Sequence, residues 1–275
     1  MTNTSVQTGY APVNGLQLYY EIHGAGEPLI LLHGGFGVTS MFDGELLPML
    51  TKTRQVITVD LQGHGRTADI DRPLRLEFMA DDIAALIKHL GLPKADIMGY
   101  SMGGDTAMRT AIQHPEVVRK LVVVSIPFKR DGWYPELRAN MAQMNRANAT
   151  FMQQTPLYQA YASVAPAPEN FPTLCEKMGD LLRQDYDWTD EVAALKMPVM
   201  IVFGDADSIA PAHAAEFFGL LGGGKMDGSW DESGMSNARL AILPGTTHCN
   251  IFYSPALAPA VTLFLDAPMS AVSKA

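Results

Sequence analysis

The feature that most constrains this chain is a serine held between glycines, where a predicted strand meets a predicted helix. Residues 96–104 have the sequence Asp-Ile-Met-Gly-Tyr-Ser-Met-Gly-Gly, and a helical pattern follows over 102–114. A serine at so sharp a turn has a strained backbone, and the glycines keep strand and helix from colliding. The turn pushes the Ser101 hydroxyl over the sheet edge and aims the first helical N–H groups at the atom it attacks. The pentapeptide alone could occur by chance, but its place between strand and helix indicates a nucleophile.

Length and charge restrict the kind of partner that the chain can bind. Its 275 residues are enough for one large domain, and 47% hydrophobic with 18% charged residues is typical of a folded globular protein. The net charge of −9 argues against a nucleic-acid surface or an anionic membrane surface. We therefore expect a small-molecule substrate, no nucleic-acid partner and no membrane partner. The oligomeric state is left open.

The cysteines and the chain ends favour a reducing compartment. Cys175 and Cys249 form neither a disulfide framework nor a metal-spaced cluster, so we expect a cytoplasmic location. Residues 1–5 lack a basic start and an apolar run, so no signal peptide is expected, and no apolar stretch is long enough to span a bilayer. Cys249, beside His248, is interpreted as a small buried residue. The tail 270–275 is expected to fray.

Strand and helix patterns alternate along most of the chain. Residues 8–23 predict a hairpin around Asn14-Gly15, and 222–237 predict a surface loop. The other predicted strands are 28–32, 55–60, 97–98, 121–124, 197–203 and 239–243, and the predicted helices are 40–50, 78–90, 102–114, 211–221 and 255–265. This alternation implies an α/β fold with a mostly parallel sheet of the eight-stranded type and helices on both faces.

The alternation stops between the sixth and seventh strands. Residues 128–195 are rich in methionine and aromatic residues, and prolines interrupt their helical periods. We predict a helical cap there, inserted after the sixth strand, with 1–127 and 196–275 forming the core domain. Most of these apolar side chains are expected in the core, and the rest on an adaptable substrate pocket. The pocket candidates are Phe36, Trp133, Met141, Met144, Phe151 and Tyr158.

Two further stretches follow buried strands and carry polar side chains. His33-Gly34-Gly35 ends the first of these strands, and its glycines let backbone N–H groups approach a ligand closely. His33 itself is interpreted as a structural residue that makes hydrogen bonds, rather than as a catalyst. Asp60 and His64 follow the next strand, and a hydrogen-bonded loop shaping the site wall is favoured over an acid/base pair.

Four stretches, taken in order, resemble those of α/β-hydrolases of the lipase/esterase type. They are His33-Gly34-Gly35, Gly99-Tyr100-Ser101-Met102-Gly103, Gly204-Asp205-Ala206-Asp207 and Gly245-Thr246-Thr247-His248. The resemblance covers nearly the whole chain, and the predicted cap is its least diagnostic part. It is specific for the fold and weakly specific for the substrate, because one fold hosts many activities.

The resemblance implies a serine hydrolase with Ser101 as nucleophile, Asp207 as acid and His248 as base, in the chain order that this fold uses. Each of the three follows a strand, so all can meet at one sheet edge. Asp205 competes for the acid role, but the spacing from the glycine that ends the strand favours Asp207. A second place for the acid, directly after the sixth strand, holds Ser125 instead of a carboxylate.

The remaining implied parts are an oxyanion hole and an acyl-enzyme. The backbone N–H groups of Gly35 and Met102 are expected to bind the oxyanion, with Phe36 as the alternative to Gly35, and losing one such donor costs ~2.7–4 kcal/mol. No metal and no cofactor are expected. The expected activity is hydrolysis of small to medium apolar carboxylic esters. A lactonase, a perhydrolase and a small-molecule receptor on the same fold are the alternatives.

Overall fold

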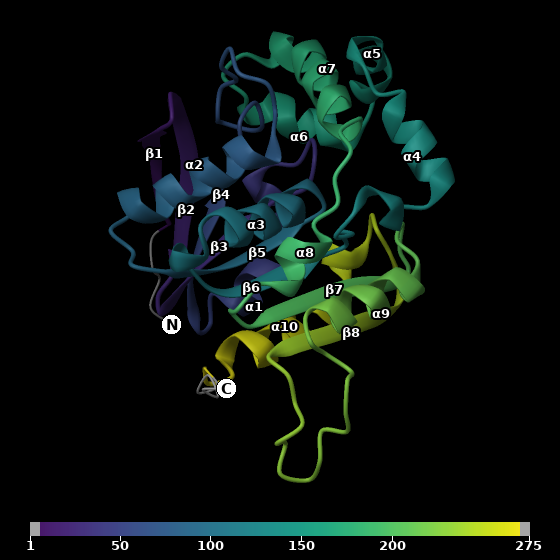
Figure 1. Ribbon diagram of the computed structural model, residues 1–275. Helices are drawn as coiled ribbons and strands as arrows, with labels where there is room; N and C mark the ends of the chain where they lie inside the picture. The colour runs from purple at the N-terminus through teal and green to yellow at the C-terminus, as the bar shows by residue number, and fades with distance from the viewer. Residues whose placement is uncertain (1–5, 270–275) are drawn as a thin grey trace.

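The strands join in one eight-stranded sheet (Figure 1). The computed structural model describes residues 6–269, so the predictions for 1–5 and 270–275 lie outside it. The strands are β1 (Gln7–Val13), β2 (Leu16–Gly24), β3 (Glu27–Leu32), β4 (Arg54–Val59), β5 (Ala95–Tyr100), β6 (Val118–Val124), β7 (Val199–Ala206) and β8 (Ala238–Thr247). Their order across the sheet is β1-β2-β4-β3-β5-β6-β7-β8. The pairs from β4 to β8 are all parallel, which confirms the predicted mostly parallel sheet.

The antiparallel part of the sheet is the predicted hairpin. β1 and β2 pair from Val13 opposite Leu16 outward, and β2 also pairs antiparallel with β4. Asn14 and Gly15 both have positive φ, 47° and 87°, as a two-residue hairpin turn of type I′ requires. The Asn-Gly pair therefore sets the register of the first two strands.

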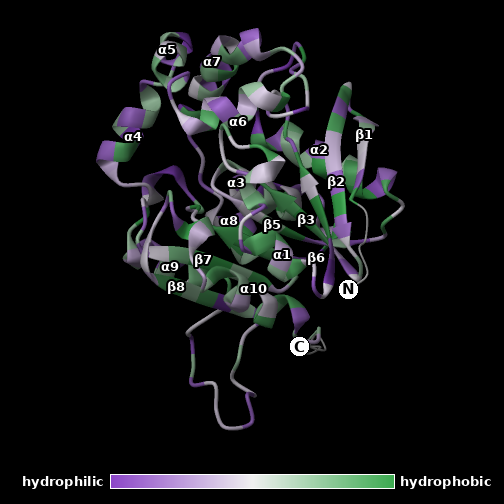
Figure 2. Ribbon diagram, turned by 180° about the vertical axis from the view of Figure 1, so that it is seen from behind, coloured by the Kyte–Doolittle hydropathy of each residue, from purple (hydrophilic) through white to green (hydrophobic). Residues whose placement is uncertain are grey.

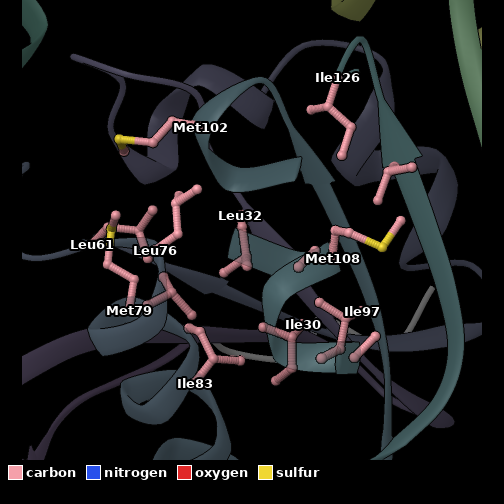
Figure 3. Close-up of a cluster of buried hydrophobic side chains, with 14 of the residues drawn as sticks. Ile30, Leu32, Leu61, Leu76, Met79, Ile83, Ile97, Met102, Met108 and Ile126 are labelled. Carbon is pink, nitrogen blue, oxygen red and sulfur yellow. The ribbon is translucent and has the colours of Figure 1, made fainter. Parts of the chain in front are cut away.

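Helices cover both faces of the sheet. They are α1 (Leu46–Leu50), α2 (Leu76–His89), α3 (Met102–Gln113), α4 (Pro135–Ala142), α5 (Ala149–Met152), α6 (Pro156–Val164), α7 (Phe171–Leu182), α8 (Thr189–Ala193), α9 (Pro211–Leu220) and α10 (Leu257–Asp266). The cluster under α2, α3 and α9 takes alternate strand residues such as Ile30 and Leu32 (Figure 3), whereas Leu29 and Leu31 belong to the cluster under α1 and α10. This alternation follows from the period of two in a strand and explains why the central strands are apolar throughout.

The segment between β6 and β7 contains α4 to α8. Figure 1 shows α4, α5, α6 and α7 gathered at one end of the molecule, while α8 contacts α9 beside the sheet. Apolar colour dominates central strands such as β3 and β5, whereas polar and apolar residues are mixed over β1, β2 and α4 to α7 (Figure 2). Trp133 and Phe171 from this segment belong to the same hydrophobic cluster as Ile97 of β5. The division into a core and a cap domain stays a prediction.

Several element ends differ from the predictions. The predicted helix 40–50 is a 3-10 turn, Thr39–Phe42, followed by the short α1, because Gly44 lies between them and favours a break. β7 and β8 continue beyond the predicted apolar runs, to Ala206 and Thr247. The predicted loop 222–237 contains no helix or strand, and Figure 1 shows it projecting on the side away from α4 to α7. Among the helices of residues 6–269, none combines the length and apolar composition needed to cross a bilayer.

Candidate active site

Ser101 lies at a strained turn between β5 and α3. Its φ of 50° and ψ of −127° are rarely adopted by a residue with a side chain, and its N–H donates to the Val124 carbonyl of β6 at 3.0 Å. A Cβ on Gly99 would collide with the Gly103 carbonyl oxygen, and a Cβ on Gly103 with the carbonyl oxygens that end β3. The glycines therefore permit the close crossing of strand and helix that the sequence pattern predicts.

Asp207 and His248 come together because β7 and β8 extend to the sheet edge. Ala206 pairs with Thr247, so the residues that follow them lie side by side. His248 Nδ1 lies 3.2 Å from Asp207 Oδ1, and His248 Nε2 lies 3.1 Å from Ser101 Oγ. The structure thus brings the three predicted residues into one hydrogen-bonded chain.

Three donors besides His248 fix the Asp207 carboxylate. The Ser125 hydroxyl donates to Oδ2 at 2.5 Å, the Gly204 N–H donates to the same oxygen at 3.0 Å, and the Ser208 N–H donates to Oδ1 at 2.7 Å. Burial alone would raise the pKa of Asp207, but the bonds from His248, Gly204 and Ser125 outweigh it and hold that pKa below its ordinary value. The carboxylate therefore stays charged and oriented.

Asp205, the competing acid, has a different environment. Its side chain is exposed and accepts a hydrogen bond from the Thr246 N–H at 3.2 Å. Ser125, in contrast, is fully buried at the alternative acid position after β6 and has a positive φ of 57°. The contact from Ser125 to Asp207 was not predicted, although its place directly after the sixth strand was the available signal.

The loop that carries His248 is fixed from two sides. The Tyr100 hydroxyl donates to the His248 carbonyl at 2.7 Å, and the two rings lie 5.1 Å apart. The Trp133 ring lies edge-on to the imidazole at 5.4 Å. The imidazole therefore has an aromatic neighbour from β5 and another from the segment that follows β6.

The glycine-rich end of β3 approaches Ser101 closely. A Cβ on Gly34 would lie 2.8 Å from the Tyr100 ring and 3.3 Å from the Ser101 Cβ. Gly35, Phe36 and Met102 line the cavity around Ser101. Within residues 6–269, no acceptor is found for the N–H of Gly35 or Met102, so both groups are free to donate to a ligand.

His33 orients this loop by hydrogen bonds on both ring nitrogens. Nδ1 lies 2.7 Å from the Gly34 carbonyl and therefore carries the proton, because Nε2 accepts from the Leu61 N–H at 3.1 Å. Burial lowers the pKa of His33 to about 4, so the ring stays neutral. These contacts agree with the structural role that we expected for His33.

Asp60 and His64 do not form an acid/base pair. Asp60 accepts hydrogen bonds from the Thr39 N–H at 2.7 Å and the Arg66 N–H at 2.8 Å. His64 lies 2.9 Å from the Gln62 carbonyl through Nδ1, and burial lowers its pKa to about 3. Both residues therefore serve the loop structure. Across the described residues, no group of three or more His, Cys, Asp or Glu is arranged to hold a metal ion.

The cavity above Ser101 has a volume of about 310 Å³. Among the pocket candidates, Phe36, Trp133 and Met141 line it. Further lining residues that were not predicted include Leu76, Asp105, Met178, Leu181, Tyr186 and Trp188. Most of these come from α7 and the loop after it, whose cavity-facing side is set by tertiary packing.

The other three pocket candidates do not reach the cavity. Phe151, on the four-residue α5, is 69% exposed. The Tyr158 ring packs on Phe171 at 4.8 Å, and Met144 packs against the hydrophobic core. Cys249 was expected to be buried, but it is exposed at the cavity because it follows His248 past the end of β8.

The chain matches one protein family over more than half of its length. Residues 27–189 match the model of the family described as alpha/beta hydrolase fold. The matched segment runs from β3 through the Ser101 turn to the start of α8. It therefore includes the predicted nucleophile and the glycine-rich loop.

Similar proteins cover nearly the whole chain. A protein named non-heme haloperoxidase, from Rhodococcus erythropolis, is 26% identical over 268 residues, which cover 86% of this chain and 90% of that protein. Carboxylesterase CesB from Bacillus subtilis has a similar structure, with a TM-score of 0.75 and 17% identity over 97% of this chain and 94% of that one. The enol-lactonase from Burkholderia xenovorans LB400 has a TM-score of 0.69 and 23% identity over 94% and 100%. At these identities, the two solved structures show a shared fold only.

Proposed function

Because the chain belongs to the alpha/beta hydrolase fold family, we propose that it is a serine hydrolase that cleaves carboxylic esters of small to medium apolar substrates. One observation carries the proposal: the hydrogen-bonded chain from Asp207 through His248 to Ser101 opens onto a mainly apolar cavity of about 310 Å³. A cavity of this size is at the lower end of small-molecule sites, which favours a small or medium substrate.

The proposed reaction begins with attack of Ser101 Oγ on the ester carbonyl carbon. A serine hydroxyl is a weak nucleophile, so His248 Nε2, at 3.1 Å, takes its proton as the new bond forms. Asp207 holds the imidazole tautomer and stabilises the imidazolium. The protonated His248 then gives the proton to the leaving alcohol, and the acyl group stays on Ser101. Water, activated by the same base, releases the acid and restores the serine.

The developing oxyanion needs donors that are already oriented. The free N–H groups of Met102, at the N-terminus of α3, and Gly35, in the loop after β3, are the proposed pair, with Phe36 as the alternative to Gly35. The neutral His33 ring supports this loop through the Gly34 carbonyl. Each donor is expected to stabilise the transition state by ~2.7–4 kcal/mol.

A perhydrolase is the second candidate, and the whole-length relative named non-heme haloperoxidase favours it. Hydrogen peroxide would replace water in attacking the acyl-enzyme, and the products would be a peroxy acid and the free serine. The same three residues would act in the same roles. Peroxy-acid formation measured beside ester hydrolysis, at equal acyl-donor concentration, separates the two acceptors.

The first experiment is a hydrolysis panel of p-nitrophenyl esters with acyl chains from C2 to C12, with Ser101→Ala alongside. We expect release with an optimum in chain length, and a loss of roughly 10⁶-fold in kcat for the variant. Background release across the whole panel would instead favour a lactonase, a narrower hydrolase or a ligand-binding protein.

A fluorophosphonate probe tests the nucleophile without turnover. The unaltered protein should be labelled stoichiometrically, and Ser101→Ala should not be labelled, because the probe reacts with an activated serine. Ser163→Ala, at an exposed position on α6, is the matched serine control and should still be labelled. Stoichiometric labelling of Ser101→Ala at another residue would overturn the assignment.

A further inference from the structure

The cavity contains a carboxyl group that the proposed mechanism does not use. Asp105 lies on α3, four residues after Ser101, and lines the same cavity. Its Oδ1 is closed off from solvent and has no hydrogen-bond partner within residues 6–269. A buried polar atom without a partner is costly. The side chain as a whole is half-buried and borders the cavity, so a ligand there would give this carboxyl group the hydrogen-bond partner that it lacks among the described residues.

A second polar group on the wall has an unused donor. The Tyr186 hydroxyl accepts a hydrogen bond from Trp133 Nε1 at 3.3 Å, and no acceptor for its own proton is found in the described part of the chain. Tyr186 lines the cavity, and the proximity of Asp105 contributes, after burial, to a pKa of Tyr186 well above its ordinary value. The two residues come from different parts of the chain, α3 and the loop after α7, and line the same cavity.

The surroundings of Asp105 favour a neutral carboxyl group. Burial alone raises its pKa well above the ordinary value, and no Lys or Arg among residues 6–269 forms an ion pair with it. Two arginines line the cavity. Arg138 pairs with Asp131, and Arg130, which lies near Tyr186, forms no ion pair with Asp105. The N-terminal position on α3 favours a charged carboxylate only weakly, compared with the cost of burying an unpaired charge. A neutral carboxyl group can both donate and accept a hydrogen bond.

We propose that Asp105 and Tyr186 form a polar subsite that binds a neutral oxygen-bearing group of the substrate, such as an ether, hydroxyl or amide. This inference rests on the proposed function, since it names the substrate class of the same site. Four residues along a helix rise about 6 Å, so the bound oxygen lies roughly three to five bonds from the carbonyl that Ser101 attacks. Apolar esters of equal size leave the subsite unsatisfied and are expected to be poorer substrates.

Pairs of esters with equal chain length test this subsite. On the acyl side the pair is p-nitrophenyl 4-methoxybutanoate and p-nitrophenyl hexanoate; on the alcohol side it is 2-methoxyethyl acetate and n-butyl acetate. Rates are divided by those of alkaline hydrolysis, to remove intrinsic reactivity, and by active sites titrated with fluorophosphonate. We expect at least about tenfold higher kcat/KM for the ether in one pair. Equal values in both pairs would overturn the inference and leave the esterase proposal intact.

Variants assign this preference to the two residues. Asp105→Leu should abolish it, whereas Asp105→Asn, which keeps a donor and an acceptor, should retain most of it. Tyr186→Phe removes one hydroxyl and should reduce the preference. It is the deciding variant if Asp105→Leu does not fold. Asp185→Asn, an exposed carboxylate on the same cavity, is the matched control and should leave the preference unchanged. An unchanged preference in both Asp105→Leu and Tyr186→Phe would overturn the assignment.

A charged-ligand pair separates a neutral subsite from a cation site. Acetylcholine and 3,3-dimethylbutyl acetate have the same shape and differ in charge. If the unaltered protein selects acetylcholine and Asp105→Asn abolishes that selection, the neutral subsite is overturned in favour of a carboxylate that binds cations. A preference for the ether without selection of acetylcholine supports the neutral subsite.

Binding provides a measurement that does not depend on turnover. Trp133 and Trp188 line the cavity, whereas Trp230, the third tryptophan of the chain, is fully exposed. Quenching of their fluorescence by the ester pairs in Ser101→Ala should give about tenfold tighter binding of the ether. Tighter binding without turnover of any ester would support the subsite and defeat the esterase proposal. Equal binding would overturn the subsite.

Discussion

The residues at the sheet edge are positioned by backbone pairing, whereas the residues that α4 to α7 add to the cavity are positioned by side-chain packing. Ser101 is fixed by its hydrogen bond to Val124, and Asp207 and His248 follow the paired ends of β7 and β8. Met141 and Met178, in contrast, reach the cavity from helices that contact it through flexible apolar side chains. We call the residues at the carboxyl ends of the strands, Ser101, Asp207 and His248, the edge, and the residues that α4 to α7 add to the cavity the wall. Small changes of geometry should therefore reduce activity severely at the edge and only slightly at the wall.

The sharpest test of the edge compares two neighbouring carboxylates. Asp207→Asn should lower kcat by roughly 10⁴-fold, because an amide in place of the carboxylate stabilises the wrong imidazole tautomer. Asp205→Asn is the matched control, since Asp205 contacts the Thr246 N–H and not His248. Steady-state kinetics on the best p-nitrophenyl ester measures both variants. A large loss for Asp205→Asn with a small one for Asp207→Asn would reverse the assignment of the acid.

The Ser101 turn should be the least tolerant of added volume. Gly103→Ala places a methyl group against the backbone carbonyl oxygens of Leu32 and His33, which cannot rotate away, so we expect a loss of about 3 kcal/mol in the free energy of unfolding. Gly219→Ala, in α9, has open space around the added methyl group and should increase stability by about 0.5–1 kcal/mol. Urea unfolding measures both, and equal effects would contradict the steric account.

The edge could be predicted from the sequence because its signals are local. Ser101, Asp207 and His248 each follow an apolar run in the order that one fold uses, and parallel strands bring their carboxyl ends to the same edge. The predicted ends of β7 and β8 were too short, because polar residues at a sheet edge do not continue an apolar pattern.

The wall could be predicted only in part. Trp133 and Phe151 are both aromatic residues of the same segment, yet one lines the cavity and the other is 69% exposed. A four-residue helix such as α5 has too few turns to show a periodic apolar face. Asp105 was missed for a related reason: the cavity that it lines is completed by residues about eighty positions later, such as Tyr186.

The buried histidines behind the edge predict a dependence of stability on pH. Burial lowers the pKa of His33 to about 4 and of His64 to about 3, below the ordinary 6.5. Since the unfolded chain binds these protons first, their contribution is fully present above pH 6.5 and is lost as the pH falls toward 4. Within that window, each histidine should lower the free energy of unfolding by up to about 1.4 kcal/mol for each unit by which the pH falls.

His64→Phe isolates one of these contributions. The variant keeps an aromatic ring beside His33 and Phe36 and removes the titrating group. Its loss of stability between pH 6.5 and 4.5, measured by urea unfolding, should be smaller than that of the unaltered protein by about 2 kcal/mol. His89→Asn, at an exposed position on α2, is the control and should follow the unaltered protein. Parallel curves for His64→Phe would show that His64 is not buried as the structure has it.

The smallest expected effect concerns the wall. Met141→Ala removes a side chain that lines the cavity, so the preferred acyl chain should lengthen. We expect kcat/KM for the longer esters to rise by roughly threefold. This is less than the tenfold change that corresponds to about 1.4 kcal/mol. Phe151→Ala, from the same segment, removes a largely exposed ring and should leave the chain-length profile unchanged. The p-nitrophenyl ester series measures both. An equal shift in Phe151→Ala would mean that α5 moves over the cavity during turnover, and the wall would then differ from the edge in mobility as well as in how it is held.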